Sequence, residues 1–256
     1  MNSGIYTAYS GMQAQADALD VLANNLANVN TTGFKEEKAF FTLLQQSAGE
    51  SDEQNALGAA INKPVTVHSA FSGETGFIKT TERDLDIAIE GEGFLVVQTP
   101  QGIRYTRNGN LHKNSKGVLI TSEGHPVLGA EKKPITLGPG KIVISERGDI
   151  QIGQMGGGGN SQQDSIEVDR LKLVRFKNLT SLEKEGSSLF VLRNEQDAPM
   201  ESDAKIRVGC LEQSNVNPVK AVVSMVSILR NFEAIQKSMN LITNEMNKQA
   251  IETLSP

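Results

Sequence analysis

The chain has 256 residues, of which 38% are hydrophobic, so it is long enough to bury at least one sizeable core. Its 25 basic and 30 acidic residues are spread along the chain and give a formal net charge of −5, which argues against a nucleic-acid partner because no cationic surface is available to phosphates. No apolar run reaches the roughly 18 residues of a membrane span or forms the core of a cleaved signal peptide near the N-terminus, so we expect neither feature.

The first predicted element is a helix from about Ser3, whose hydroxyl can cap it, to about Asn28. Residues along it recur with the three-then-four spacing of a heptad seam. The seam comprises Ile5, Ala8, Met12, Gln15, Leu19, Leu22, Leu26 and Val29. Apart from Asp17 and Asp20 the segment is uncharged, and its other positions hold mainly small or amide side chains. Such a surface suits close contact with other helices better than contact with bulk water.

The middle of the chain changes from helical to alternating periodicity. Residues 35–46 are expected to extend the first helix, and residues 47–64, which are polar and contain Gly and Ala, to form a transition loop. From residue 65 onward, short apolar runs alternate with turn signals such as Asn108-Gly109, which is typical of hairpins. We therefore predict an all-β, hairpin-rich body of sandwich or barrel type over residues 65–210.

A second long helix is predicted near the C-terminus, within residues 211–256. Asn217 suits the N-cap position, Pro218 suits the first helical position, and the pattern continues to about Thr253. The heptad seam of this helix comprises Ala221, Met225, Ile228, Phe232, Ile235, Met239, Ile242 and Met246. Because a heptad stripe gains stability only when another helix covers it, residues 1–46 and 211–256 are predicted to form one coiled-coil stalk, which makes the fold α+β.

A further apolar stripe flanks the C-terminal seam. It comprises Val219, Val222, Val223, Val226 and Leu229. A two-stranded coil needs one stripe on each helix, so the extra apolar surface predicts contacts beyond the chain's own N-terminal helix. The alternative is an intramolecular helical hairpin that closes the core of a monomer, which would leave this stripe in water.

Four carboxylates give the strongest hint of chemistry in the chain. Asp84, Asp86, Glu90 and Glu92 bracket a short apolar strand and could be imagined as an acid/base pair or a calcium site. Strict alternation along that strand places Asp84 and Asp86 on its solvent face. We therefore expect the four carboxylates to be surface groups.

The remaining candidates for chemistry are isolated residues and turns. The three histidines, His68, His112 and His125, lack metal-ligand spacing. The glycine-containing segments 138–141 and 156–159 lack the pattern of a phosphate-binding loop and are expected to be turns or linkers. Cys210 is expected to be a small buried or half-buried thiol. We predict no catalytic residue, no cofactor and no metal site.

Four segments form a recognisable set. They read LANNLANVNTTGFK at 22–35, LDIAIEGEGF at 85–94, YTRNGNL at 105–111 and LEQSNVNPV at 211–219. Together they resemble the axial proteins of the bacterial flagellum, and the size of the chain together with GHPVLG at 124–129 resembles the basal-body rod protein family more than the larger hook protein. The resemblance covers most of the chain and is weakest over residues 48–63 and 153–163.

Two types within the family compete. The proximal-rod type, rod protein F, is favoured by RNGNL at 107–111, by RLKLV at 170–174 and by the modest insertion after residue 45. The distal-rod type, rod protein G, is favoured by GIYTA at 4–8 and NVNTTG at 28–33. We favour the proximal-rod type and keep the distal-rod or hook type as the alternative.

The resemblance also implies a location and partners. Family members leave the cell through the type III export apparatus of the flagellum without cleavage. They pack helically with one another and with other axial proteins, terminal helices inward and β domain outward, and so form the periplasmic drive shaft. The resemblance implies a structural subunit without enzymatic activity. The residues predicted to form the assembly interface are Ile5, Met12, Leu19, Leu22, Leu26, Val29, Met225, Ile228, Phe232, Ile235, Met239, Ile242 and Met246.

Two other functional classes remain as alternatives. A secreted binding protein or adhesin would need a groove lined by aromatics, whereas the chain has no Trp and only 3 Tyr. An enzyme acting within an assembly would need converging titratable side chains, and the sequence offers no such set.

Overall fold

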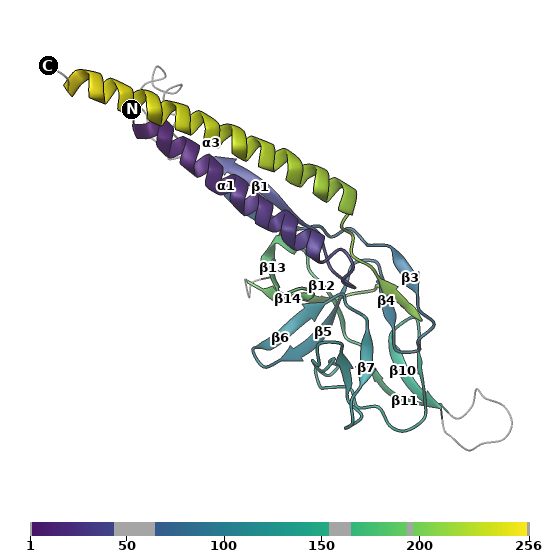
Figure 1. The fold of residues 1–256 in the computed structure, drawn as a ribbon. Coiled ribbons are helices and arrows are strands. Elements are labelled where there is room, and N and C mark those ends of the chain that lie inside the picture. Colours follow the sequence, from purple (N-terminus) through teal and green to yellow (C-terminus); the bar gives the residue numbers. More distant parts are fainter. Residues whose placement is uncertain (1, 44–64, 154–164, 194–196, 255–256) are drawn as a thin grey trace. The chain divides into compact units, whose positions relative to one another are not determined.

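The protein divides into two compact units. The structure, a computed structural model, describes residues 2–43, 65–153, 165–193 and 197–254 (Figure 1). The helical unit comprises residues 1–27, 37–70 and 217–256, and the β unit comprises residues 28–36 and 71–216. Within the described residues, no helix has both the length and the apolar character needed to cross a bilayer.

Two long helices, α1 (Asn2–Ala27) and α3 (Pro218–Leu254), pack side by side in the helical unit (Figure 1). The predicted start of the second helix is confirmed, because Oδ1 of Asn217 accepts the backbone N–H of Lys220 at 3.1 Å and Pro218 occupies the first helical position. The first helix ends at Ala27, so Val29 of the predicted seam lies beyond it, in the β unit. The predicted α+β class, with a helix at each end of the described chain, is confirmed.

A strand replaces the helical extension predicted over residues 35–46. Strand β1 (Glu37–Leu43) pairs with β2 (Val65–Phe71) in a two-stranded sheet, so the prediction of helix is wrong here. The side chain of Asn25 holds both backbone groups of Glu37, since its Oδ1 accepts the N–H at 2.9 Å and its Nδ2 donates to the carbonyl at 2.7 Å. Those groups are unavailable to a helix, and the following Phe40 and Phe41 favour extended backbone.

The strands of the β unit are short and pair antiparallel. In chain order they are β3 (Ile78–Thr80), β4 (Ile87–Glu90), β5 (Phe94–Thr99), β6 (Gly102–Thr106), β7 (Leu111–Lys113), β8 (Leu119–Thr121), β9 (Lys141–Ile144), β10 (Asp149–Gly153), β11 (Ser165–Arg170), β12 (Leu173–Arg175), β13 (Leu182–Glu185), β14 (Leu189–Leu192), β15 (Met200–Glu201), β16 (Lys205–Val208) and β17 (Cys210–Glu212). The largest sheet has the order β13-β14-β6-β5-β12-β15, a second has the order β11-β10-β9, and three further pairs are β16-β4, β17-β3 and β7-β8. A short 3-10 helix, η2 (Leu179–Ser181), precedes β13.

Strand β5 lies between two hydrophobic cores. Its residues Leu95 and Val97 belong to one core, and Phe94 and Val96, on the opposite face, belong to the other. A strand buried on both faces reads as a continuous apolar run, which is how residues 94–97 appear in the sequence. The hairpin-rich β body is confirmed, but its sheets are open in the described residues, with β13 and β15 at the edges of the largest one, and no closed barrel forms there.

Candidate functional site

The seam side chains of the two helices are only partly covered within one chain. Met12, Leu19, Leu22 and Leu26 of α1 are half-buried, as are Met225, Ile228, Phe232, Ile235 and Met239 of α3. Ile242 is 48% exposed. The side chains of Ile5 and Met246 lie outside the residues whose burial is described. The packing of α1 on α3 therefore leaves apolar surface on the seam that a further helix could bury.

The deepest contacts of α1 come from smaller side chains beside the seam. Ala14 and Ala18 are 2% and 1% exposed, and Asn25, on the same helical face, is 1% exposed. On α3 the matching buried position is Ala221. Small side chains let two helices approach closely. Ala221 belongs to the predicted seam, whereas Ala14, Ala18 and Asn25 were not predicted as contacts, although the spacing of four between Ala14 and Ala18 was an available signal.

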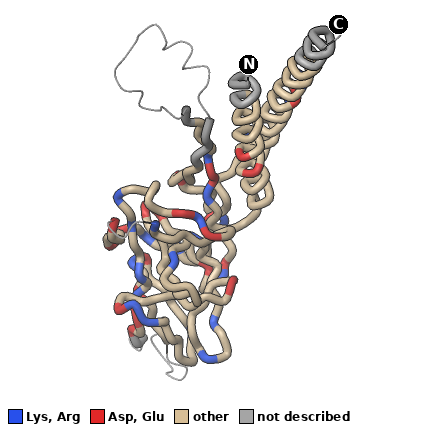
Figure 2. The backbone as a smooth tube through the Cα atoms, turned by 90° about the vertical axis from the view of Figure 1, so that its left-hand side faces the viewer, with Lys and Arg blue, Asp and Glu red and all other residues tan. Residues whose placement is uncertain are grey.

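The second apolar stripe of α3 is exposed, as expected from the sequence. Its exposed fractions are 71% at Val219, 45% at Val222, 64% at Val223, 44% at Val226 and 44% at Leu229. Over this stretch Lys220 is the single charged residue, and α1 carries only Asp17 and Asp20. Figure 2 shows that charged residues are sparser on the helices than in the β unit. Exposed apolar surface of this extent in a stretch with a single charge is typical of a contact surface.

The β unit contains a buried ionic cluster, formed by Lys35, Arg107 and Glu212, that the sequence reasoning did not predict. Their side chains are 1%, 3% and 0% exposed. Nζ of Lys35 lies 2.6 Å from Oε1 of Glu212, and Nε of Arg107 donates to Oε2 of the same carboxylate at 2.8 Å. The three residues come from three of the segments that carry the family resemblance, at 22–35, 105–111 and 211–219.

The side chains of the ionic cluster also make hydrogen bonds with backbone groups. Nζ of Lys35 also donates to the carbonyl of Glu74 at 2.6 Å, and the N–H of Gly76 donates to Oε1 of Glu212 at 2.9 Å. Nη2 of Arg107 donates to the carbonyls of Ile89 and Gly91, each at 3.0 Å. The cluster thereby joins the segments at which the chain enters and leaves the β unit to its central strands.

Two cations share the one carboxylate of the cluster. Burial lowers the pKa of Lys35, and the neighbouring Arg107 guanidinium lowers that pKa further, against the opposing effects of the Glu212 and Glu74 carboxylates. Since the charges of the cluster are buried, its stability is expected to be sensitive to any change in its members.

Close backbone packing surrounds the entry segment. Gly33 has a φ of +70°, and a Cβ placed there would lie 2.5 Å from the backbone nitrogen of Asn108. The hydroxyl of Thr32 donates to Oδ1 of Asn108 at 2.9 Å, and the N–H of Gly33 donates to the carbonyl of Glu212 at 2.8 Å. Only glycine fits this position, so the Thr-Gly-Phe-Lys segment is fixed by geometry as well as by charge.

The carboxylates predicted as surface groups are not all on the surface. Asp84 and Glu92 are exposed, and Glu90 pairs with Arg207 of the neighbouring strand at 2.6 Å. The side chain of Asp86 is instead 1% exposed, with Oδ1 3.4 Å from Nη1 of Arg83. Its solvent-facing placement was wrong because Ala88, two residues on and so on the same face, is also only 1% exposed: β4 is buried on both faces at this point.

The histidines and the cysteine considered in the sequence do not come together in one site in the described residues. His112 contacts Arg83 at 3.3 Å, and Nε2 of His125 lies 3.8 Å from Oε2 of Glu123. In the described ranges no group of three His, Cys, Asp or Glu side chains is placed to hold a metal ion. Cys210 is buried, with its Sγ 3.8 Å from the hydroxyl of Thr80. The side chain of His68 and residues 156–159 lie outside the described part.

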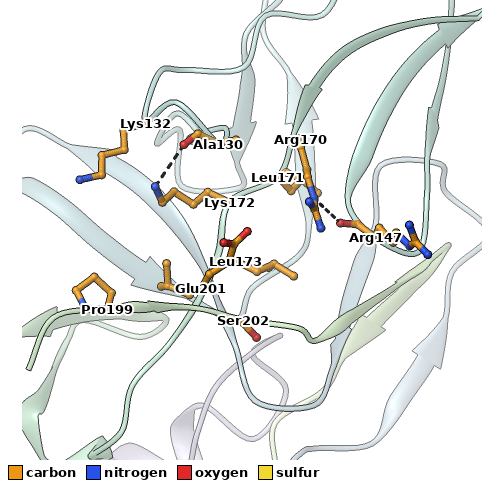
Figure 3. A pocket seen from close by; sticks show the side chains of 11 residues that line it. Ala130, Lys132, Arg147, Arg170, Leu171, Lys172, Leu173, Pro199, Glu201 and Ser202 are labelled. Atoms are coloured by element: carbon orange, nitrogen blue, oxygen red, sulfur yellow. Dashed lines mark hydrogen bonds between the residues drawn. The ribbon is translucent and has the colours of Figure 1, made fainter.

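A basic pocket of about 410 Å³ opens in the β unit (Figure 3). Four cations line it, namely Lys132, Arg147, Arg170 and Lys172, together with the carboxylate of Glu201. The side chain of Lys172 donates to the carbonyl of Ala130 at 3.3 Å, and Nε of Arg170 donates to the carbonyl of Arg147 at 3.2 Å. Lys132, Arg147 and Arg170 are exposed, whereas Lys172 is half-buried.

Family models match three parts of the chain. The model described as Flagella basal body rod protein matches residues 5–35, which include most of α1 and Lys35. Flagellar hook protein FlgE/F/G D1 domain matches residues 88–167, within the β unit. Flagellar basal body rod FlgEFG protein C-terminal matches residues 207–253, which include Glu212 and most of α3.

Curated relatives match the chain over nearly its whole length. The chain is 34% identical to the flagellar basal-body rod protein FlgF of Caulobacter vibrioides, over 99% of this chain and 98% of that protein. It is 34% identical to FlgF of Salmonella typhimurium, over 100% of this chain and 99% of the relative. It is also 34% identical to the rod protein FlgG of Borreliella burgdorferi, over 97% of this chain and 100% of that relative.

Proposed function

The chain belongs to the flagellar basal-body rod protein family, and from this membership we propose that it is a structural subunit of the proximal rod that assembles through its two terminal helices. The family consists of structural rod proteins rather than enzymes. The partners in this proposal are copies of the same chain and other axial proteins, delivered through the flagellar export apparatus to the periplasm.

The observation that carries the assembly proposal is the exposed stripe on α3 from Val219 to Leu229. The chain's own α1 packs on α3 and still leaves this stripe in water, and the seam is only half-buried. In a helical array, a neighbour's helices would cover both surfaces, and each buried Val or Leu would contribute about 1.5–3 kcal/mol at full burial. We propose a coiled-coil core in which the seam residues and this stripe contact different neighbours.

Matched substitutions on α3 test the assembly proposal. Val223→Asp and Val226→Asp place a charge on the stripe, whereas Ser224→Asp and Ser227→Asp place the same charge on neighbouring exposed positions. The valine variants should lose swimming and intact basal bodies, because a charge buried at every repeat destabilises the array. The serine variants should retain more function. Equal swimming in all four strains would contradict the assignment of the stripe to an interface.

The proximal position rests on the FlgF relatives, and the distal position is the second candidate. FlgF proteins of two organisms match at 34% identity, as does one FlgG protein, so identity alone does not separate the two types. Electron microscopy of basal bodies carrying a tag within residues 156–159 should locate the subunit. Density close to the export apparatus would support the proximal assignment, and density near the hook would replace it with the distal one.

A further inference from the structure

A second, smaller pocket lies beside the buried ionic cluster, entirely within the β unit. Its volume is about 220 Å³, and Lys35 and Arg107 of the cluster contribute to its lining. Two more cations, Arg175 and Lys177, line it as well and are exposed to solvent. Against these four positive charges, the lining contains a single carboxylate, that of Glu92.

The carboxylate of Glu212, which adjoins the pocket, offsets one of these four positive charges. Its Oε1 accepts from Lys35 and from the N–H of Gly76, and its Oε2 accepts from Nε of Arg107. The guanidinium of Arg107 donates through Nε to Glu212 and through Nη2 to the carbonyls of Ile89 and Gly91. An anion that enters the adjoining pocket would add charge-assisted hydrogen bonds with the cations that line it. Burial, and after it the neighbouring Arg107 guanidinium, lowers the pKa of Lys35.

Aromatic rings form the apolar side of the same pocket. Phe94 and Phe176 both line it and stand edge to face, with ring centroids 5.9 Å apart. The Arg107 guanidinium lies over the Phe94 ring, 5.8 Å from its centroid, so the positive charge and the aromatic surface are adjacent. The pocket is smaller than the roughly 300 Å³ at which sites for drug-sized ligands begin, so it suits a group of amino-acid size.

We propose that this pocket binds a small carboxylate attached to an apolar or aromatic body, with the carboxylate toward Arg107 and Arg175 and the body against Phe94 and Phe176. Two sources share this chemistry: a free aromatic acid and an acidic side chain of a neighbouring chain. The inference does not depend on the position of the protein in the rod.

The proposal can be tested by adding small ligands to the full-length chain at protein concentrations too low for it to assemble. Amide NMR shifts of Gly73 and Gly93, which line the pocket, report binding of sodium benzoate, of the neutral analogue benzamide, and of acetate. Benzoate should bind saturably in the millimolar range, benzamide at least tenfold more weakly because it lacks the charge, and acetate at least fivefold more weakly because it lacks the ring. N-acetyl-glutamate N-methylamide represents an acidic side chain of a neighbouring chain. Tighter binding of this compound than of benzoate would identify a neighbouring chain as the source of the carboxylate, and tighter binding of benzoate would identify a free aromatic acid.

Variants on the rim separate specific binding from general charge attraction. Arg175→Gln should weaken benzoate binding about fivefold, and Lys177→Gln should also weaken it, whereas Lys116→Gln removes an exposed charge that does not line this pocket and should leave binding unchanged. Both rim residues are exposed, so the variants should keep the fold, which unchanged thermal unfolding verifies. The proposal would be overturned if the amide shifts did not saturate at benzoate concentrations up to 50-fold above the expected range. It would also be overturned if Arg175→Gln and Lys116→Gln weakened benzoate binding equally.

Discussion

Nζ of Lys35 and Oε1 of Glu212 lie 2.6 Å apart although 177 residues separate them in the sequence. Both side chains are buried, and the contact joins the segment that enters the β unit to the segment that leaves it. With Arg107 on the other carboxylate oxygen, the pair fixes the two ends of the β unit next to each other. In a subunit that transmits torque, such a closure would hold the β unit together where the chain passes to its helices.

Removal of the charge of Glu212 should strongly destabilise the β unit. Glu212→Gln leaves Lys35 and Arg107 buried without their anion, and breaking a buried pair in this way costs about 3–5 kcal/mol. Glu90→Gln, which breaks the partly exposed pair with Arg207, should cost at most about 1 kcal/mol. Urea unfolding of both variants provides the comparison. Similar midpoints for the two would show that the ionic cluster contributes no more than a surface pair.

The titration of Lys35 should make the β unit more stable as the pH rises toward 10.5, the ordinary pKa of a lysine side chain. Its folded-state pKa is lowered, so between that value and 10.5 the unfolded chain binds more protons than the folded chain, and raising the pH favours folding. Below the folded-state pKa the residue is charged in both states and its contribution no longer changes. Lys35→Met abolishes this titration.

The test of this pH effect is the difference in unfolding free energy between wild type and Lys35→Met, measured from pH 7 to pH 10.5. Wild type should gain relative to the variant as the pH rises, and other titrating groups cancel in the difference. A difference that is flat, or that falls toward alkaline pH, would mean that the pKa of Lys35 is not lowered in the folded chain.

A methyl group at Gly33 should be far more harmful than one at another glycine of similar backbone conformation. Gly33→Ala combines a positive φ with a clash against the backbone of Asn108, whereas Gly124 has a φ of +88° and no heavy atom within 4 Å of the added Cβ. Gly124→Ala should therefore show the conformational cost alone, about 1–2 kcal/mol, and Gly33→Ala a clearly larger loss. Thermal unfolding of the two variants measures the difference, and equal losses would exclude the clash.

Charges on the helix seam should block assembly without affecting the β unit. Leu22→Asp or Ile235→Asp introduces a carboxylate at a half-buried position, where burial against a neighbour would cost several kcal/mol per subunit. Ala23→Asp and Gln236→Asp, at exposed adjacent positions, serve as controls. Swimming assays and calorimetry of the β unit's transition read out the two effects. Wild-type motility with Leu22→Asp and Ile235→Asp would remove these positions from the interface.

Substitution of the two aspartates that precede β4 should change stability by different amounts. Asp84→Asn changes an exposed group and should alter stability by no more than about 0.5 kcal/mol. Asp86→Asn weakens a buried carboxylate's interaction with Arg83 and should cost about 1 kcal/mol or more. Melting temperatures with and without calcium complete the test. If calcium raised the melting temperature of the wild type but not that of Asp86→Asn, Asp86 would have to be part of a metal site.

The structure also explains where local reasoning fails in this chain. The prediction of helix through residue 46 relied on continuity with α1, whereas the backbone of Glu37 is bound by the side chain of Asn25 and directed into β1. The outward placement of Asp86 assumed that one face of β4 meets solvent, whereas Ile87, Ala88 and Ile89 are all buried. In both cases contacts made by the folded chain override a pattern of a few residues.

The sequence by itself determined the terminal helices, because their signals are local. Asn217 and Pro218 define the start of α3 within one turn, and the heptad spacing marks the faces that need a partner. Only the tertiary structure decided that Lys35, Arg107 and Glu212 meet, since nothing near each residue in sequence specifies a partner so far away. Their burial depends on the chain closing the β unit on itself, and a lysine, an arginine and a glutamate in three separate segments are otherwise indistinguishable from solvated surface residues.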